Sequence, residues 1–171
     1  MSSGGGSGPP RAAALPTAKT LSPVARRRLG KELDEWLSAE PPVPGMSVSA
    51  TERLDLWMVM VTGAENTVFA NEEYVLRFSF PADYPIEPPE VIFVHPTPRH
   101  PHVYTNGHIC LNVLYDGWSP ALTVTSVCLS ILSMLSSATA KGQPPDNDAY
   151  VRNCHGRSPK ATRWMFHDDK V

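Results

Sequence analysis

Three apolar runs decide the fold of this chain: LDLWMVMV at 54–61, YVLRFSF at 74–80 and VIFV at 91–94. Each run is rich in β-branched and aromatic residues, which favour strands. The segments between them contain turn formers, including Thr62-Gly63 and a proline-rich stretch that begins at Pro81. With a shorter strand expected at 46–50, the pattern predicts a meander of four antiparallel strands.

Helical patterns flank the predicted sheet. Ser22 is suited to cap a helix that begins at Pro23 and continues, with apolar residues at helical spacing, until Pro41-Pro42. A core helix is expected over 123–137, TVTSVCLSILSMLSS, because its apolar side chains form one stripe. One or two short helices should follow the Pro-Pro turn at 144–145. This order of elements predicts an α+β domain.

Composition places the chain among folded globular proteins. Apolar residues make up 42% of the 171 positions and charged residues 19%. No apolar run reaches the ~18 residues that a membrane-spanning helix needs. The 15 Lys and Arg against 17 Asp and Glu give a net charge of -2, which disfavours nucleic acid and anionic membranes as partners. The first residues lack the apolar core of a secretory signal, so we expect a cytoplasmic or nuclear protein.

The beginning of the chain differs from the rest. Residues 1–20 are mostly Gly, Ser, Pro and Ala, with little apolar surface to bury. Ordering such a segment costs backbone entropy without an apolar gain. We therefore predict a disordered tail over 1–20 and one folded domain over 21–171.

The segment HPHVYTNGHICLN at 100–112 concentrates reactive side chains, since it holds three histidines and Cys110. It could ligate zinc, form a Cys–His nucleophile pair, or be a packed loop with incidental imidazoles. Zinc is disfavoured because no CxxC or HxxxH pattern accompanies it, so no metal site is predicted. Of the 3 cysteines, Cys128 lies on the apolar stripe of the core helix and is expected to be buried and inert.

Several blocks in one order resemble the ubiquitin-conjugating enzyme family, over roughly residues 22–170. They are the basic first helix, the strand meander, YPIEPPEVIF at 84–93, HPHVYTNGHICL at 100–111, WSPAL at 118–122 and the core helix that follows. Within the family, GHICL at 107–111, SVCLSILSMLSS at 126–137 and the ending RWMFHDDKV are most similar to the W-type branch. The resemblance implies the family's fold, and it implies transfer of ubiquitin to the free N-terminal amine of substrates.

The resemblance also implies roles for residues near the cysteine. Cys110 resembles the cysteine that accepts ubiquitin as a thioester from the ubiquitin-activating enzyme; that enzyme uses the ATP, so no cofactor is expected here. His100 and Pro101 resemble a pair that locks the loop. His102 stands where the family has an asparagine that stabilises the oxyanion, and it is expected to act in that role or to hold the loop.

A second departure lies in PPDNDAY at 144–150. Lysine-directed relatives place an acidic residue near the cysteine from this loop, whereas here Asn147 takes that position, with Asp146 and Asp148 on either side. At pH about 7.4 an α-amino group of pKa about 7.7–8.0 is roughly a quarter neutral, and a lysine only about 0.1%. Losing a well-placed acid should therefore penalise lysine more. We expect a preference for flexible N-termini, with Asp146 and Asn147 beside Cys110.

The resemblance also implies a docking surface. The positions that match contacts of the activating enzyme and of RING or U-box ligases are Arg27, Lys31, Ile86, Pro120 and Ala121. From the residues alone, the basic face of the first helix, formed by Arg26, Arg27, Arg28 and Lys31, is either solvated or a docking surface.

Three further aromatic residues carry expectations. Trp118 should pack the loop beside the cysteine. His108 should face solvent or, as the alternative, tune the Cys110 thiolate. Trp164 should either close the core or reach the active site. The predicted function is a ubiquitin-conjugating enzyme that receives ubiquitin on Cys110 and transfers it, with a ligase, to substrate amines. The alternatives are a catalytically silent scaffold of the same fold and a zinc-binding interaction module.

Overall fold

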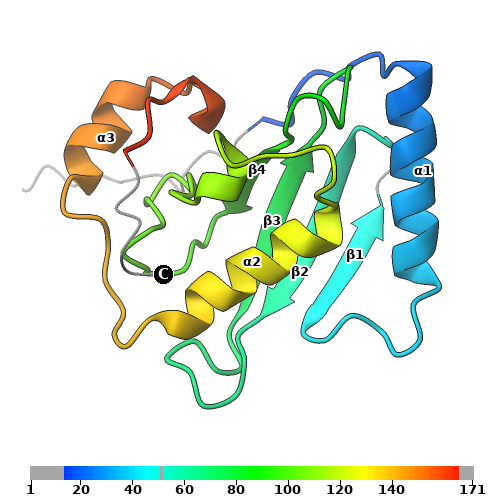
Figure 1. Ribbon diagram of the computed structural model, residues 1–171. Helices are drawn as coiled ribbons and strands as arrows, with labels where there is room; N and C mark the ends of the chain where they lie inside the picture. The colour runs from blue at the N-terminus through cyan, green and yellow to red at the C-terminus, as the bar shows by residue number, and fades with distance from the viewer. Residues whose placement is uncertain (1–13, 51, 166–171) are drawn as a thin grey trace, which may run out of the picture.

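The computed structural model describes residues 14–50 and 52–165 of the chain. Its elements are α1 (Pro23–Leu37), β1 (Met46–Ala50), β2 (Leu56–Thr62), β3 (Glu73–Ser79), β4 (Glu90–Val94), the short 3-10 helix η1 (Asn112–Leu114), α2 (Val124–Ser137), α3 (Asn147–Cys154) and the 3-10 helix η2 (Pro159–Ala161). In Figure 1, α2 crosses one face of the sheet, α1 stands beside β1, and α3 lies at the opposite end. The predicted α+β architecture is confirmed.

The sheet is an antiparallel meander in the order β1-β2-β3-β4, as predicted. Val59 of β2 pairs with Leu76 of β3, for example. β2 starts at Leu56 rather than at 54, because the Leu56 N–H donates to the Arg53 carbonyl at 3.2 Å and closes a turn there. Within the described part of the chain, no helix is long and apolar enough to cross a membrane.

Helix α1 begins where the sequence predicts and ends earlier. The Ser22 hydroxyl accepts the Ala25 N–H at 3.1 Å, and Pro23 is the first helical residue. The helix ends at Leu37, before the Pro41-Pro42 pair that was expected to stop it. The buried face comprises Ala25, Leu29, Glu32 and Trp36, whereas Val24 and Leu37, two apolar residues of the same helix, are exposed.

A buried carboxylate joins α1 to the rest of the domain. Glu32 is 7% exposed, and its Oε2 accepts the Tyr84 hydroxyl at 2.6 Å. Its Oε1 accepts the Val124 N–H at 2.7 Å, in the first turn of α2, where a negative charge is favoured by the helix dipole. Glu32 therefore ties three distant segments together, a contact that helical periodicity alone does not reveal.

Helix α2 is the predicted core helix. Thr123 and Ser126 form a capping box at its start. Val124, Val127, Cys128, Ile131, Met134 and Leu135 are its buried residues, and they join strand side chains such as Trp57 and Phe78 in one core. Cys128 is fully buried as expected, and burial raises its pKa well above the ordinary value.

The segment before α1 contacts the folded body. Residues 14–20 form no helix or strand, yet Arg53 donates to the Pro16 carbonyl at 2.7 Å and the Lys19 N–H donates to Asp55 at 3.0 Å. The Arg53–Asp55 pair therefore bonds two backbone groups of the segment predicted to be a disordered tail. Residues 1–13 lie outside the described residues.

Candidate active site around Cys110

The loop before Cys110 is fixed by Gly107. Its φ is +90°, in the left-handed region, and a Cβ there would lie 2.1 Å from the Phe93 carbonyl oxygen of β4. The Phe93 N–H donates to the Gly107 carbonyl at 2.9 Å, and the Gly107 N–H donates to the Tyr104 carbonyl at 2.9 Å. Only glycine combines this backbone angle with such a close approach. The turn therefore holds the backbone three residues before Cys110 against β4, the edge strand of the sheet.

His100 locks the same loop to α2. It is 2% exposed, and its Nδ1 accepts the His102 N–H at 2.9 Å. Its Nε2 lies 3.0 Å from the Met134 carbonyl, so we assign the proton to Nε2, since a carbonyl can only accept. Burial lowers the pKa of His100 to about 4, so the ring stays neutral near pH 7. Its position fits the loop-locking role expected for it with Pro101.

His102 lies directly beside Cys110. Its carbonyl accepts the Cys110 N–H at 2.9 Å, and its half-buried side chain lines the same groove as the cysteine. The ring centroid lies 5.5 Å from that of His100. The backbone of His102 thus holds the cysteine in place. Its imidazole faces the groove onto which Cys110 opens.

Cys110 opens onto a groove of about 490 Å³. Its walls come from three parts of the chain: the loop 101–110, the segment 144–150 and residues 162–165. Cys110 is partly exposed, whereas Cys128 and Cys154 are buried. Of the three thiols, Cys110 is therefore the one that a large partner can reach.

Aromatic side chains dominate one wall of this groove. Tyr104 stacks on Tyr150 with ring centroids 3.9 Å apart, and Trp164 lies 5.4 Å from Tyr150. Trp164 also stacks on Tyr115, just outside the groove, at 5.0 Å. Trp164 thus lines the groove rather than closing the core. The tyrosines were missed because nothing in their local sequence separates them from core aromatic residues.

The loop 144–150 contributes differently from what its sequence suggests. Asp146 lines the groove and accepts the Tyr104 hydroxyl at 3.0 Å. Asn147 is 4% exposed; its Oδ1 accepts the Thr105 N–H at 2.9 Å, and its Nδ2 donates to the Thr105 hydroxyl at 3.1 Å. Asn147 is not among the described residues that line the groove, so its place beside Cys110 stays a prediction. Its amide is occupied in clamping the loop, and Asp146 is the residue that faces the thiol.

Electrostatics keep the Cys110 thiol protonated. Burial, and secondarily the negative charge of Asp146, raise its pKa to about 11. At pH 7.5 such a thiol is almost entirely protonated. Free Cys110 is thus a weakly reactive thiol, because little of it is in the thiolate form that acts as the nucleophile.

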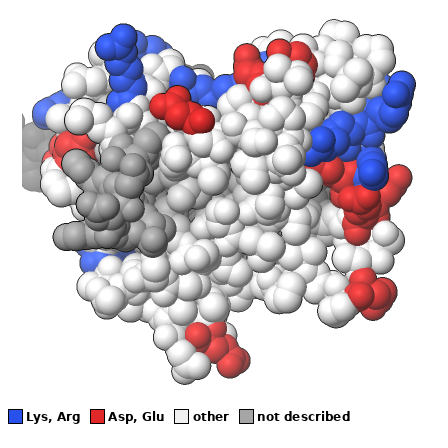
Figure 2. Space-filling view, viewed as in Figure 1, with Lys and Arg blue, Asp and Glu red and all other residues white. Residues whose placement is uncertain are grey.

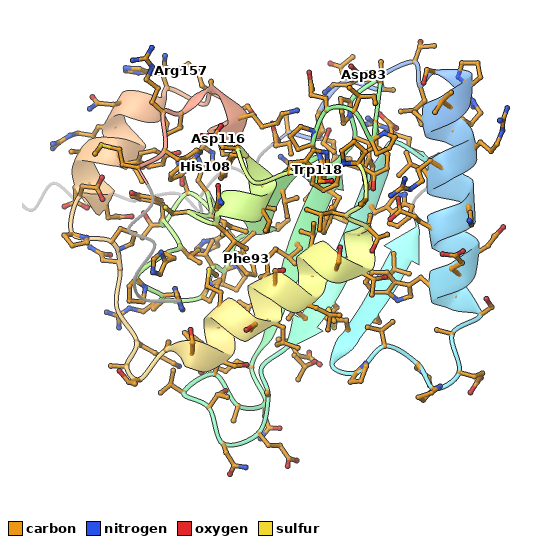
Figure 3. All side chains as sticks on the ribbon, viewed as in Figure 1. Asp83, Phe93, His108, Asp116, Trp118 and Arg157 are labelled. Carbon is orange, nitrogen blue, oxygen red and sulfur yellow. The ribbon has the colours of Figure 1, made fainter. Side chains whose placement is uncertain are left out.

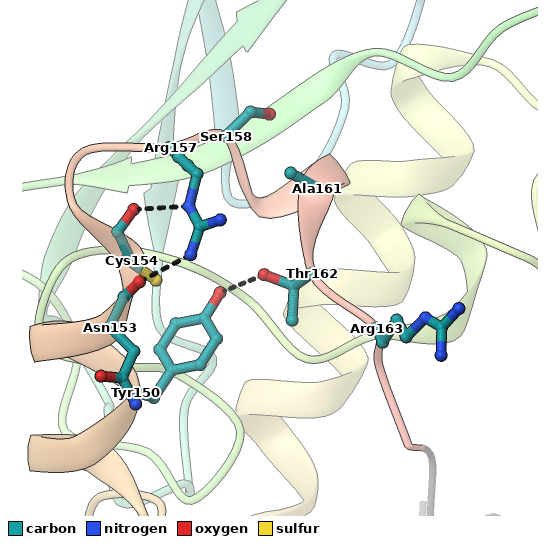
Figure 4. Close-up of a pocket in the computed structure, with 8 residues that line it drawn as sticks. All are labelled: Tyr150, Asn153, Cys154, Arg157, Ser158, Ala161, Thr162 and Arg163. Carbon is teal, nitrogen blue, oxygen red and sulfur yellow. Dashed lines mark hydrogen bonds between the residues drawn. The ribbon is translucent and has the colours of Figure 1, made fainter.

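His108 does not face solvent as expected, because it is 7% exposed. Its Nδ1 lies 2.8 Å from the Tyr150 hydroxyl and 3.8 Å from the Cys154 sulfur, and Figure 3 shows it beside α3. Burial lowers its pKa to about 4. The Tyr150 hydroxyl also bonds Thr162 at 3.0 Å, as Figure 4 shows. His108 therefore anchors α3 and the segment behind it, instead of tuning Cys110.

A metal centre finds no support around this site. Among residues 14–50 and 52–165, no group of three or more His, Cys, Asp or Glu side chains could hold a metal ion. His100 is engaged at both nitrogens by protein groups, and His108 is engaged by Tyr150.

The residues expected to dock partners form a second surface, which we call the docking patch: Arg27, Lys31, Ile86, Pro120 and Ala121. All five are exposed, and Ile86 is 71% exposed. Figure 2 shows Lys and Arg side chains gathered on the α1 side of the molecule. Arg27 and Lys31 line one hollow with Pro85, the residue before Ile86, and Arg28 bonds the Pro120 carbonyl, so the five positions lie on one side of the domain.

Two side chains hold the docking patch together. Arg28 donates to the Pro120 and Leu122 carbonyls at 2.9 Å each, and to Glu32 at 3.1 Å. Arg28 is therefore a structural brace and not part of a solvated basic face. Trp118, labelled in Figure 3, donates from its indole nitrogen to the Pro85 carbonyl at 2.9 Å. It braces the loop of Ile86, and it also lies against Tyr84, 5.9 Å between ring centroids.

Comparison with known proteins agrees with this architecture. The sequence profile described as ubiquitin-conjugating enzyme matches residues 28–167. Ubiquitin-conjugating enzyme 15 of Arabidopsis thaliana is 59% identical over 157 residues, covering 91% of this chain and 96% of that protein. Ubiquitin-conjugating enzyme E2 W of Caenorhabditis elegans is 51% identical over 155 residues, covering 88% of this chain and 100% of that protein.

A solved structure gives the same result. The crystal structure of ubiquitin conjugating enzyme E2 UbcA1 from Agrocybe aegerita superposes with a TM-score of 0.76 at 41% identity, covering 81% of this chain and 100% of that chain. The predicted family and its fold are confirmed. This chain therefore belongs to the ubiquitin-conjugating enzyme family and lies close to its E2 W members.

Proposed function

We propose that Cys110 is the residue on which this enzyme carries ubiquitin, as a thioester, before transfer to a substrate amine. The observation that supports this most is accessibility: Cys110 is the partly exposed thiol, at the mouth of a groove, and the other two cysteines are buried. A carrier cysteine must meet both a large donor and an incoming amine. The proposed partners are ubiquitin, the ubiquitin-activating enzyme that uses the ATP, and RING or U-box ligases.

The chemistry is two successive acyl transfers. The Cys110 sulfur attacks the thioester carbonyl of the charged activating enzyme, a new S–C bond forms, and the activating enzyme's thiol leaves as a thiolate. The proton lost by Cys110 balances the one that this thiolate takes up. A substrate amine then attacks the new carbonyl; an amide forms, the Cys110 thiolate leaves, and the proton released by the amine restores the thiol.

The raised pKa of Cys110 suits a carrier. A thiol of pKa about 11 is a poorer leaving group than one at the ordinary value, so its thioester resists hydrolysis. Burial penalises the charged thiolate and not the uncharged thioester. The groove thus favours the loaded state until a partner or substrate assists departure of the thiolate.

The groove also supports a preference for α-amino groups. Asp146 is the one carboxylate among its described lining residues, and it already accepts the Tyr104 hydroxyl. Asn147 is turned away to Thr105. Among the described lining residues, a lysine, about 0.1% neutral at pH about 7.4, would find only this one carboxylate, already shared with Tyr104, to help remove its proton, whereas an α-amino group is already roughly a quarter neutral. Flexible N-termini are therefore the proposed substrates.

A charging gel tests the carrier role. The full chain is incubated with activating enzyme, ATP and ubiquitin, and a reductant-sensitive adduct is expected. Cys110→Ser should give a reductant-resistant ester and Cys110→Ala no adduct, with Cys128→Ala as the matched control that still charges. An adduct that survives Cys110→Ala rules out the assignment and would favour another site.

A discharge assay tests the amine preference. The charged enzyme is mixed with free lysine, with a short peptide bearing a free N-terminus, or with the same peptide acetylated at its N-terminus. Loss of thioester should be fast only with the free peptide. Efficient discharge onto lysine or onto the acetylated peptide would contradict the proposed preference while leaving the carrier role intact.

A further inference from the structure

Four serine and threonine residues of the chain directly precede a proline: Ser22, Thr97, Ser119 and Ser158. Ser22 and Ser158 cap helices, since their hydroxyls accept the Ala25 and Lys160 N–H groups. Both are only partly exposed, as is Thr97, whereas Ser119 is exposed. Of these four residues, Ser119 is therefore the most accessible to a modifying enzyme.

The surroundings of Ser119 suit a modifying enzyme. Ser119 lies outside helices and strands, before the turn at Pro120-Ala121. A residue before proline is biased towards extended backbone, the form in which a kinase binds its substrate. The Ser119 hydroxyl oxygen accepts the Ala121 N–H at 3.2 Å, which leaves its proton available for transfer.

Positive charge lies against the residue that follows Ser119. The Arg28 guanidinium is 2.9 Å from the carbonyl of Pro120, the residue after Ser119. Arg27 and Lys31 follow on the exposed side of α1, and Arg27, Arg28 and Lys31 line one hollow with Pro85. A phosphate on Ser119 would thus find a guanidinium within reach, the setting in which a phosphoserine forms charge-assisted hydrogen bonds.

We propose that Ser119 is a phosphorylation site for a proline-directed protein kinase and that its phosphate switches off the docking patch. In the reaction the Ser119 oxygen attacks the γ-phosphorus of ATP, the new O–P bond forms, and the bond from that phosphorus to the ADP oxygen breaks. The hydroxyl proton passes to the base of the kinase. The kinase supplies the ATP, so no other reactant is needed.

The consequence for docking follows from charge. The phosphate adds about -1.5 to -2 charges at pH 7 beside Pro120 and Ala121, and it draws Arg28 away from the carbonyls that it braces. A ligase surface complementary to the basic side of α1 then meets a negative group, and like charges across an interface weaken binding. Ligase-stimulated discharge should fall by about ten-fold or more. Discharge onto a small amine without ligase should be unchanged, since Ser119 lies outside the Cys110 groove.

This effect on docking rests on the proposed function, whereas the phosphate acceptor does not. The full chain is treated with a purified cyclin-dependent kinase and ATP, and phosphorylated peptides are identified by mass spectrometry. One phosphate on Ser119 is expected. Ser119→Ala should abolish it, Ser119→Thr should retain it, and Ser158→Ala, the matched control on a helix cap, should leave it unchanged.

The phosphorylated and unphosphorylated enzymes are then charged to equal thioester levels and discharged with and without ligase. The proposal is overturned if Ser119 stays unmodified while another Ser-Pro or Thr-Pro site is modified or none is. It is also overturned if phosphorylation leaves ligase-stimulated discharge unchanged. Failure of the unmodified enzyme to charge would instead refute the carrier role of Cys110, so the two failures are distinguishable.

Discussion

The raised pKa of Cys110 predicts a slow rate of alkylation. Its pKa of about 11, against the ordinary 9.0, means a thiolate fraction at pH 8 of about 0.1% instead of about 9%. A thiolate of higher pKa is intrinsically more nucleophilic, by roughly six- to ten-fold for two pKa units. Iodoacetamide should therefore react with Cys110 about ten-fold more slowly than with a cysteine in a short peptide.

Substitutions can separate the two causes of the raised Cys110 pKa. Burial is its larger cause and Asp146 the smaller. Asp146→Asn removes the charge and keeps an oxygen for the Tyr104 hydroxyl, so the inflection of the alkylation rate against pH should fall by less than half of the total shift. Asp148→Asn is the matched control, because it removes the same charge from an exposed neighbour that is not among the causes of the raised Cys110 pKa.

The assay follows alkylation of the Cys110 peptide by mass spectrometry between pH 7 and 11, which separates it from Cys128 and Cys154. An inflection at or below the ordinary value in the unmodified protein would refute the burial argument. An equal effect of Asp146→Asn and Asp148→Asn would refute the role assigned to Asp146 and point to a general charge effect.

Other predictions concern stability and docking. Tyr84→Phe should lower the free energy of unfolding in urea by about 1.5–3 kcal/mol, because it removes a hydrogen bond to the buried Glu32 carboxylate; an unchanged midpoint would contradict this. Gly107→Ala should cost more than about 3 kcal/mol, since its methyl group would lie 2.1 Å from a β4 carbonyl. Gly30→Ala, with open space in mid-helix, should instead stabilise by about 0.5–1 kcal/mol; similar effects at both glycines would refute the steric argument. Ile86→Asp should leave charging intact and slow ligase-stimulated discharge about ten-fold, as expected for an exposed interface residue; normal ligase stimulation would remove it from the docking patch.

The elements of the fold could be predicted because their signals are local. Strand runs of apolar residues, the Ser22-Pro23 helix start and the apolar stripe of 123–137 each act through backbone preference and periodicity. Ordered motifs around Cys110 were also enough to identify the family. Element ends were predicted less well, since contacts such as the Leu56–Arg53 turn set them.

The site depended on contacts between distant segments, which no local pattern encodes. Asn147 looked like a groove residue in sequence, and only the folded loop shows its amide occupied by Thr105. His108 looked like a solvent-facing loop residue, yet α3 covers it through Tyr150. The sequence by itself determined the family, the core elements and the segment 100–112 that holds Cys110. Tertiary structure decided which side chains share the groove and how far burial raises the Cys110 pKa. Both depend on contacts between segments far apart in the sequence, such as Thr105 and Asn147, which are 42 positions apart.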